Sequence, residues 1–121
     1  MASMLQKVLK PEAIRIRLQA TNKQEAIREL VDILDQAEHL KDRAEAERVL
    51  FARERSLSTG LQDGIAIPHG KTDTVDHLVV AIGIRKDGID FDCADGKPAR
   101  IFVLALSPAS KAGPHIQFLA E

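Results

Sequence analysis

Tryptophan and tyrosine are absent from this chain of 121 residues, which contains only 4 phenylalanines and one cysteine. The lone Cys93 cannot form an internal disulfide bond, and without a CxxC pair the sequence gives no sign of a zinc site. So few aromatic side chains do not provide the stacking surfaces that bind single-stranded nucleic acid. The formal net charge of -1 likewise gives no electrostatic reason to expect nucleic acid or an anionic membrane as a partner.

Long apolar segments are also missing. Residues 1–10 lack the apolar core of a signal peptide, and no run approaches the length that spans a membrane. An apolar share of 45% and a charged share of 29% are ordinary for one globular domain of this length. We therefore expect a single cytoplasmic domain over residues 1–121, without membrane insertion.

Apolar periodicity predicts two helices in the first half of the chain. Thr21 and Gln24 fit a capping box, and apolar residues then recur at spacings of three and four along one stripe. Asp42 and Glu45 form a second box, which opens a mostly charged helix that ends at Ser56–Ser58. We expect the charged residues of this second helix to face solvent.

Extended segments surround and follow these helices. Residues 13–18 alternate between apolar and basic side chains, which is typical of a half-buried strand. Residues 77–84 and 100–106 are nearly continuous apolar runs, which predict buried strands, and residues 85–88 between them resemble a turn. With a closing helix expected over residues 110–121, the pattern indicates a layered α/β domain with a sheet covered by helices.

The stretch from Ser58 to Gly70 carries the strongest chemical signal. Residues 65–67 are typical of a short buried strand, which Pro68 must end or place at an edge because proline cannot donate to a sheet ladder. His69 would then lie at the rim of the sheet on a rigid backbone, beside a glycine that permits close approach. Such a histidine is a candidate nucleophile, and a structural or surface histidine is the alternative.

Several mechanisms have no motif in this sequence. It contains no GxxxxGK[ST] or GxGxxG phosphate loop, no HExxH zinc motif and no GxSxG nucleophile elbow. What remains is His69, a second histidine (His115) at a predicted helix start, and arginines at the end of the helix before the central stretch. A ring nitrogen, cationic charge and hydrogen-bond donors together suit a phosphoryl group.

The chain resembles the enzyme IIA domain of the fructose–mannitol class (type 2) of the bacterial phosphoenolpyruvate-dependent sugar phosphotransferase system, including its nitrogen-regulatory relatives. The resemblance extends from about Leu5 to the end, in the family's order. Its first part is carried by Arg53-Glu54, Ser58-Thr59-Gly60 and Gly64-Ile65-Ala66-Ile67-Pro68-His69-Gly70. Its second part is carried by residues 89–91, 95–98, 101–106 and 115–120.

The resemblance implies a three-layer α/β/α fold with a mixed sheet flanked by helices. It implies that His69 accepts a phosphoryl group from the phosphohistidine of the carrier protein HPr and passes it to a cysteine of an enzyme IIB domain for sugar uptake. His115 and Arg53 match the family's second active-site histidine and its active-site arginine, and Thr59 and Gly60 would add phosphoryl-binding backbone donors.

The same resemblance implies that no metal or organic cofactor is needed, because the donor is another protein. Cys93 lies in a loop of the IIA-like region and is not the acceptor cysteine. Since the family's domain continues with further helix, we expect this chain to lack a C-terminal helical segment.

Two other functions stay open at this point. One is a regulatory protein of the nitrogen-linked branch, whose phosphorylation state is read by protein partners and whose phosphoryl group goes to no sugar. The other is a non-catalytic sensory module that uses the histidine only as a switch.

Overall fold

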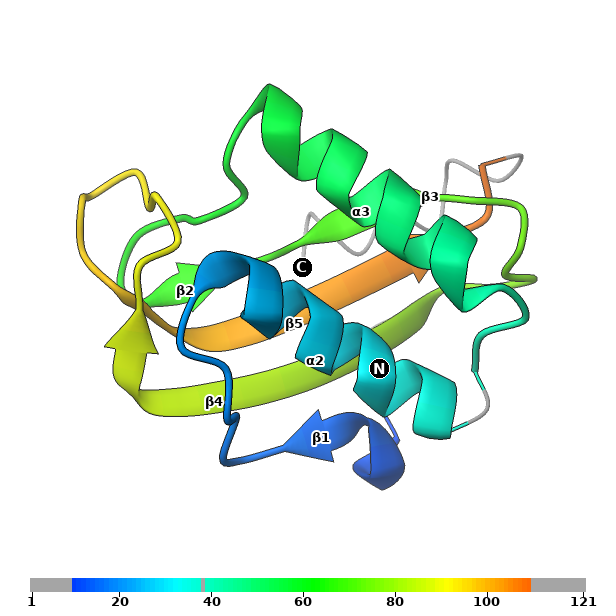
Figure 1. Cartoon of the computed structure of the whole chain (residues 1–121), viewed down its shortest axis with the longest axis horizontal. Helices are drawn as coiled ribbons and strands as arrows, with labels where there is room; N and C mark the ends of the chain where they lie inside the picture. The colour runs from blue at the N-terminus through cyan, green and yellow to red at the C-terminus, as the bar shows by residue number, and fades with distance from the viewer. Residues whose placement is uncertain (1–9, 38, 110–121) are drawn as a thin grey trace, which may run out of the picture.

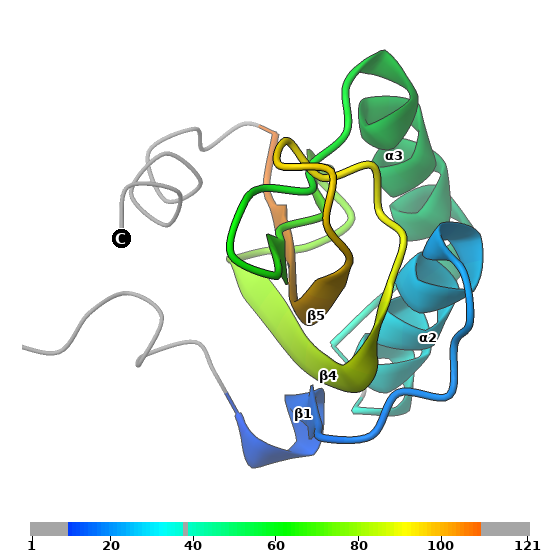
Figure 2. The same ribbon diagram turned by 90° about the vertical axis from the view of Figure 1, so that its left-hand side faces the viewer.

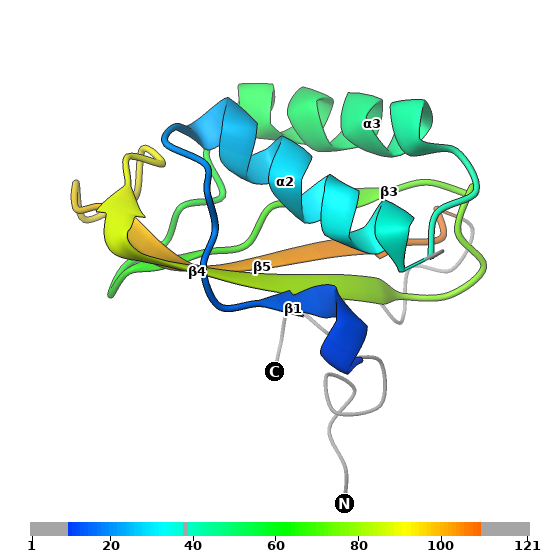
Figure 3. The ribbon, with the colours of Figure 1, turned by 60° about the horizontal axis from the view of Figure 1, so that its bottom comes forward.

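The computed structural model describes residues 10–37 and 39–109, which form a mixed five-stranded sheet with two helices (Figure 1). Figures 2 and 3 show that both helices lie on the same face of the sheet. The elements are a 3-10 turn (Pro11–Ala13), β1 (Ile14–Arg15), α2 (Lys23–Gln36), α3 (Arg43–Ser56), β2 (Ile65–Ala66), β3 (His69–Lys71), β4 (Val79–Ile89) and β5 (Ala99–Ser107).

The sheet is built on the antiparallel pair β4 and β5. β1 lies parallel to β4 on one side, and both β2 and β3 lie parallel to β5 on the other. Ile65 pairs with Ile101 and His69 pairs with Ala105, so β2 and β3 follow one another along the same edge of β5. The predicted α/β fold with a mixed sheet is confirmed.

Pro68 separates these two short strands without moving the chain off the sheet. β2 ends at Ala66, as the lack of a proline N–H requires, but the carbonyl of Pro68 accepts a hydrogen bond of 2.9 Å from Ala105 N–H. His69 is therefore the first residue of a further strand rather than the start of a loop.

α2 forms because its apolar residues lie on one stripe and its first turn is capped. The predicted cap is wrong by one residue: Asn22, not Thr21, is the N-cap, and its side chain accepts from Glu25 N–H. Thr21 instead donates its N–H and hydroxyl to the Glu25 carboxylate, and the backbone bond from Thr21 is the main cause that lowers the Glu25 pKa.

α3 begins where the sequence predicts. The Asp42 side chain accepts from Glu45 N–H at 3.1 Å, and the helix ends at Ser56. Arg43 pairs with Asp32 and Asp35 of α2 and thereby links the first turn of α3 to the second half of its neighbour.

Two extended segments differ from prediction. The alternating segment 13–18 forms a strand only at Ile14–Arg15, and Ile16 is 69% exposed, so the alternation does not mark a half-buried strand. The predicted turn at residues 85–88 lies inside β4, which continues to Ile89 with a register shift after Ile84. Gly88, at φ 84°, accommodates this irregularity in a conformation that other residues rarely adopt.

The main core lies between the two helices and the sheet. Its largest fully buried side chains include Phe91 and Phe102, whose rings lie 5.5 Å apart between centroids. None of the helices in the described ranges has the length and apolarity to cross a membrane. The helix expected over residues 110–121 lies outside the described residues.

Candidate functional site

His69 opens β3 and is held by its own backbone neighbourhood. Its Nδ1 lies 2.8 Å from the carbonyl oxygen of Ile67, and the side chain is half-buried. A carbonyl can only accept, so Nδ1 must carry the proton and donate it. This tautomer puts the nucleophilic lone pair of the neutral ring on Nε2.

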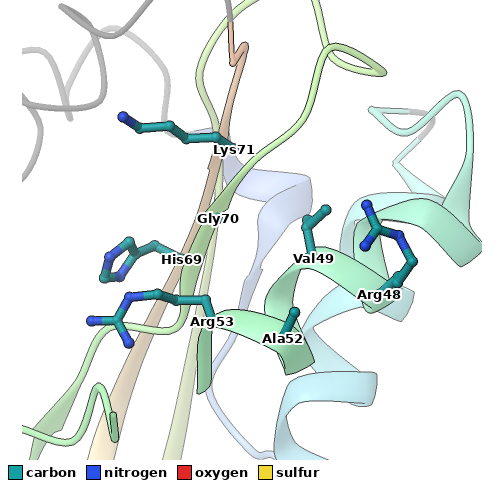
Figure 4. A pocket seen from close by; sticks show the side chains of 7 residues that line it. All are labelled: Arg48, Val49, Ala52, Arg53, His69, Gly70 and Lys71. Carbon is teal, nitrogen blue, oxygen red and sulfur yellow. The ribbon is translucent and has the colours of Figure 1, made fainter. Parts of the chain in front are cut away.

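The histidine lines a hollow of about 290 Å³ between α3 and β3 (Figure 4). In Figure 4 the His69 ring and the Arg53 side chain lie next to one another and extend to the same side. The lining residues come from α3 (Arg48, Val49, Ala52, Arg53) and from β3 (His69, Gly70, Lys71).

Gly70 allows α3 to lie close enough to β3 to form this hollow. A Cβ added at Gly70 would lie 3.2 Å from Val49 Cγ2, which is tighter than an ordinary contact. Since neighbouring strand residues point to opposite faces, Gly70 meets α3 while His69 and Lys71 share the other face. The predicted role of this glycine in permitting close approach is confirmed for α3.

Arg53 is fixed at the end of α3. Its Nη1 donates to the carbonyl oxygen of Leu57 at 2.6 Å, one of the last carbonyls that the helix itself cannot pair. The other N–H groups of its planar guanidinium can bind an anion in a fork. The structure thus brings together two of the predicted site residues, His69 and Arg53.

Thr59 and Gly60, predicted as phosphoryl binders, do not line the hollow. Thr59 donates both its N–H and its hydroxyl to the carboxylate of Glu54, at 2.8 and 2.6 Å. Gly60 N–H donates to the Ser58 hydroxyl at 3.0 Å, and a Cβ at Gly60 would lie 2.7 Å from the carbonyl oxygen of Phe91. Both residues therefore hold the loop before β2, and their part in phosphoryl binding stays a prediction.

His115 lies outside the described residues. Cys93 is 8% exposed, and burial, followed by the charges of Asp95, Asp90 and Asp92, raises the pKa of its thiol. Within residues 10–37 and 39–109, no three His, Cys, Asp or Glu side chains gather in a way that could hold a metal ion.

Sequence reasoning missed Lys71, which is among the residues that line the hollow and lies on the same strand face as His69. Lys71 is two residues from His69, and this spacing places both residues on one face of a strand. The spacing is informative only if the residues after Pro68 are recognised as a strand. It also missed Glu54, which carries a buried carboxylate between α3 and the following loop.

The sequence matches the family described as "Phosphoenolpyruvate-dependent sugar phosphotransferase system, EIIA 2" over residues 7–121. A fructose-specific EIIA component of Haloferax volcanii is 38% identical over 109 residues, which cover 90% of this chain and 71% of that protein. A fructose-specific EIIABC component of Bacillus subtilis is 33% identical over 94% of this chain, which spans only 18% of that longer protein. A nitrogen regulatory protein of Bradyrhizobium diazoefficiens is 32% identical over 92% of this chain and 72% of its own length.

Solved structures agree with these sequence relationships. The nitrogen regulatory protein IIA-Ntr from Neisseria meningitidis superposes with a TM-score of 0.89 at 30% identity, over 98% of this chain and 80% of that one. The mannitol IIA of Escherichia coli superposes with a TM-score of 0.78 at 26% identity, over 93% and 78% of the two chains. By its sequence and its fold, this chain belongs to the type 2 EIIA family of the phosphoenolpyruvate-dependent sugar phosphotransferase system.

Proposed function

We propose that this chain is a phosphocarrier that accepts a phosphoryl group on His69 from phospho-HPr and passes it to a cysteine of an enzyme IIB domain for sugar uptake. The observation that carries the proposal is the 2.8 Å contact between His69 Nδ1 and the Ile67 carbonyl oxygen. It fixes the neutral tautomer whose Nε2 can attack phosphorus. The family to which the chain belongs is a component of a phosphotransferase system, which agrees with this chemistry.

In the first step, the Nε2 lone pair of His69 forms a new bond to phosphorus. The bond between phosphorus and the donor's histidine nitrogen breaks, and its electron pair returns to the donor ring. As His69 gives up electron density its ring becomes more positive, which strengthens the Nδ1–H bond to Ile67. Arg53 lies beside the ring and offers N–H groups to the phosphoryl oxygens, whose charge it neutralises during transfer.

In the second step, a cysteine thiolate of the IIB domain attacks phosphorus and the bond to His69 Nε2 breaks. The electron pair returns to the His69 ring, which regains the neutral tautomer. A complex of mannitol enzyme IIA with phosphorylated enzyme IIB from Escherichia coli superposes on this chain with a TM-score of 0.77 at 25% identity. A protein of this fold therefore binds a IIB partner, which supports the proposed acceptor.

Intact mass spectrometry tests the proposal. The chain is mixed with phosphoenolpyruvate, enzyme I and HPr, with the His69→Ala variant in parallel. We expect an acid-labile gain of one phosphoryl group on the original chain only, and an unchanged fold in the variant because the side chain is only half-buried. Phosphorylation of the variant on another histidine would show that His69 is not the acceptor.

A second candidate is a regulatory protein of the nitrogen-linked branch. The superposition on IIA-Ntr, with its TM-score of 0.89, favours it. The two functions differ in the second step: a transport protein donates to a IIB cysteine, whereas a regulatory protein keeps its phosphoryl group until a partner reads it. Adding purified IIB domains to the phosphorylated chain and following the loss of mass discriminates between them.

His115 is the further residue that the family resemblance assigns to the site. We propose that it donates a hydrogen bond to the phosphoryl group, so that His115→Ala slows transfer but leaves a protein that can be phosphorylated. Rapid-quench measurement of the phosphorylation rate checks this. Complete loss of phosphorylation in a folded variant would contradict it, since that result requires a larger role for His115.

A further inference from the structure

We propose that Glu54 is a positioning residue for His69. Its buried carboxylate fixes the backbone of Thr59, and through it the carbonyl group that holds the histidine ring. This inference rests on the proposed function for its kinetic consequence, but its structural consequence can be measured on the unphosphorylated protein.

The carboxylate of Glu54 is surrounded by donors. Its side chain is 5% exposed, and Oε2 lies 2.8 Å from Lys23 Nζ and 2.8 Å from Thr59 N. Oε1 accepts the Thr59 hydroxyl at 2.6 Å. A buried carboxylate is tolerated only when it is paired and hydrogen-bonded, and here the cation of α2 and two donors of one residue meet both conditions.

From Thr59 a series of hydrogen bonds leads to the site. The carbonyl oxygen of Thr59 accepts Ile67 N–H at 3.0 Å, and the carbonyl oxygen of Ile67 accepts Nδ1–H of His69 at 2.8 Å. Thr59 and Ile67 are therefore each held by a hydrogen bond from their own N–H group, and each accepts the next hydrogen bond of the series at its carbonyl oxygen. This series fixes the position of the Ile67 carbonyl but does not carry charge to it. The reason is that the N–H and the carbonyl of one residue belong to different peptide groups.

Glu54 lies on α3, the helix that also carries Arg53. Arg53, its neighbour in the sequence, lines the hollow beside His69. The same helix turn thus directs the guanidinium from one side and, through Thr59 and Ile67, the imidazole from the other. Reacting groups that are held in fixed relative geometry need less reorganisation during transfer, which is how a residue outside the hollow can influence the rate.

The test replaces Glu54 with glutamine in the full chain. Gln has nearly the same shape, but it is neutral and loses the ion pair with Lys23. Its NH₂ group also donates where a carboxylate oxygen accepts, so at least one of the hydrogen bonds to Thr59 or Lys23 must break or reverse its direction. Long-range ¹H–¹⁵N NMR of the histidine rings reports the tautomer of His69. We expect the Nδ1–H tautomer in the original chain and a mixture of tautomers in Glu54→Gln, with phosphorylation by phospho-HPr slowed about 10- to 100-fold at an unchanged KM for HPr.

Glu29→Gln is the matched control. Glu29 is also a partly buried glutamate that pairs with an arginine, Arg15, and accepts backbone N–H groups, those of Gln19 and Ala20 at 2.8–3.1 Å. It anchors the segment before α2, which is not part of the hollow around His69. We expect this variant to lose stability while the tautomer of His69 and the phosphorylation rate stay unchanged.

An unchanged tautomer and rate in folded Glu54→Gln would overturn the proposal, and so would an equal change in Glu29→Gln. If the Glu54 variant does not fold, Thr59→Val removes only the hydroxyl donor to Oε1 and is expected to shift the tautomer in the same direction. An unshifted tautomer in folded Thr59→Val would then overturn it. A tautomer shift in a chain that HPr does not phosphorylate would support the positioning role and refute the proposed function instead.

Discussion

The two helices on the sheet have the same length and the same kind of N-cap, but they are held by different interactions. α2 buries six apolar side chains along one stripe: Ala26, Ile27, Leu30, Val31, Ile33 and Leu34. α3 buries only Ala46, Leu50 and the carboxylate-bearing Glu54. It is positioned instead by the ion pairs of Arg43, by the hydrogen bonds of Glu54 and by close approach to Gly70.

This difference follows from what each helix does. Apolar burial supplies free energy but little direction, and this suits α2, which supports the sheet. Hydrogen bonds and ion pairs have preferred geometries, and they fix α3, which places Arg53 beside His69. We therefore expect substitutions in the apolar stripe of α2 to change stability and substitutions around α3 to change the rate of phosphoryl transfer.

The largest expected effect on stability is in α2. Leu30 is 0% exposed, so Leu30→Ala should lower the free energy of unfolding by about 2–5 kcal/mol through lost burial and a residual cavity. Urea denaturation followed by circular dichroism measures this loss. The phosphorylation rate of the molecules that remain folded should be unchanged, and a large decrease in that rate would break the contrast between the helices.

Arg53→Ala should have the opposite profile. We expect phosphorylation to slow by about 10²- to 10³-fold, as when one charge-stabilising donor is removed from an active site. Stability should change by only about 0.5 kcal/mol, because the side chain lies at the helix end. Arg55→Ala is the control, since Arg55 is exposed in the same helix turn but does not line the hollow. Equal slowing in both variants would mean that general positive charge, and not the position of Arg53, assists transfer.

Gly70→Ala tests the close approach of α3 and β3, and we expect it to lower stability less than Leu30→Ala and to slow phosphorylation less than Arg53→Ala. The added Cβ would lie 3.2 Å from Val49 Cγ2, so α3 must shift slightly, at a cost of about 1–3 kcal/mol in unfolding free energy. Phosphorylation should slow modestly as Arg53 moves with the helix. Adding Val49→Ala removes the crowding methyl group and should restore part of both losses. If the losses of the two single variants simply add in the double variant, the contact between residue 70 and Val49 is not their cause.

Local sequence patterns were sufficient to predict the parts of the fold that depend on periodicity and capping. The stripe of α2, the Asp42 cap of α3 and the apolar runs of β4 and β5 were all predicted from nearby residues. The extension of β4 through residues 85–88 was not, because its turn-like composition is overridden by pairing of Ile89 with Ala99. The identity of β3 was missed because Pro68 normally ends a strand, and only pairing with β5 continues it.

The candidate site was predictable to a similar extent. His69 and Arg53 were predicted from residue type and position, with the family resemblance behind the assignment of Arg53, and the structure brings them to one hollow. The burial of Glu54 was not predicted, because it stands in a charged helix and its partner Lys23 lies on another helix. A charge that is buried by tertiary contacts leaves no local periodic signal, so the interactions that orient the histidine appear only in the folded chain.

The most direct test of the central claim is ¹⁵N NMR of the His69 ring before and after phosphorylation by phospho-HPr. We predict a ring protonated on Nδ1 before the reaction and a phosphoryl group on Nε2 afterwards, with Nδ1–H still donating to the Ile67 carbonyl. Phosphorylation of His69 on Nδ1, or of another residue while His69 stays unmodified, would contradict it.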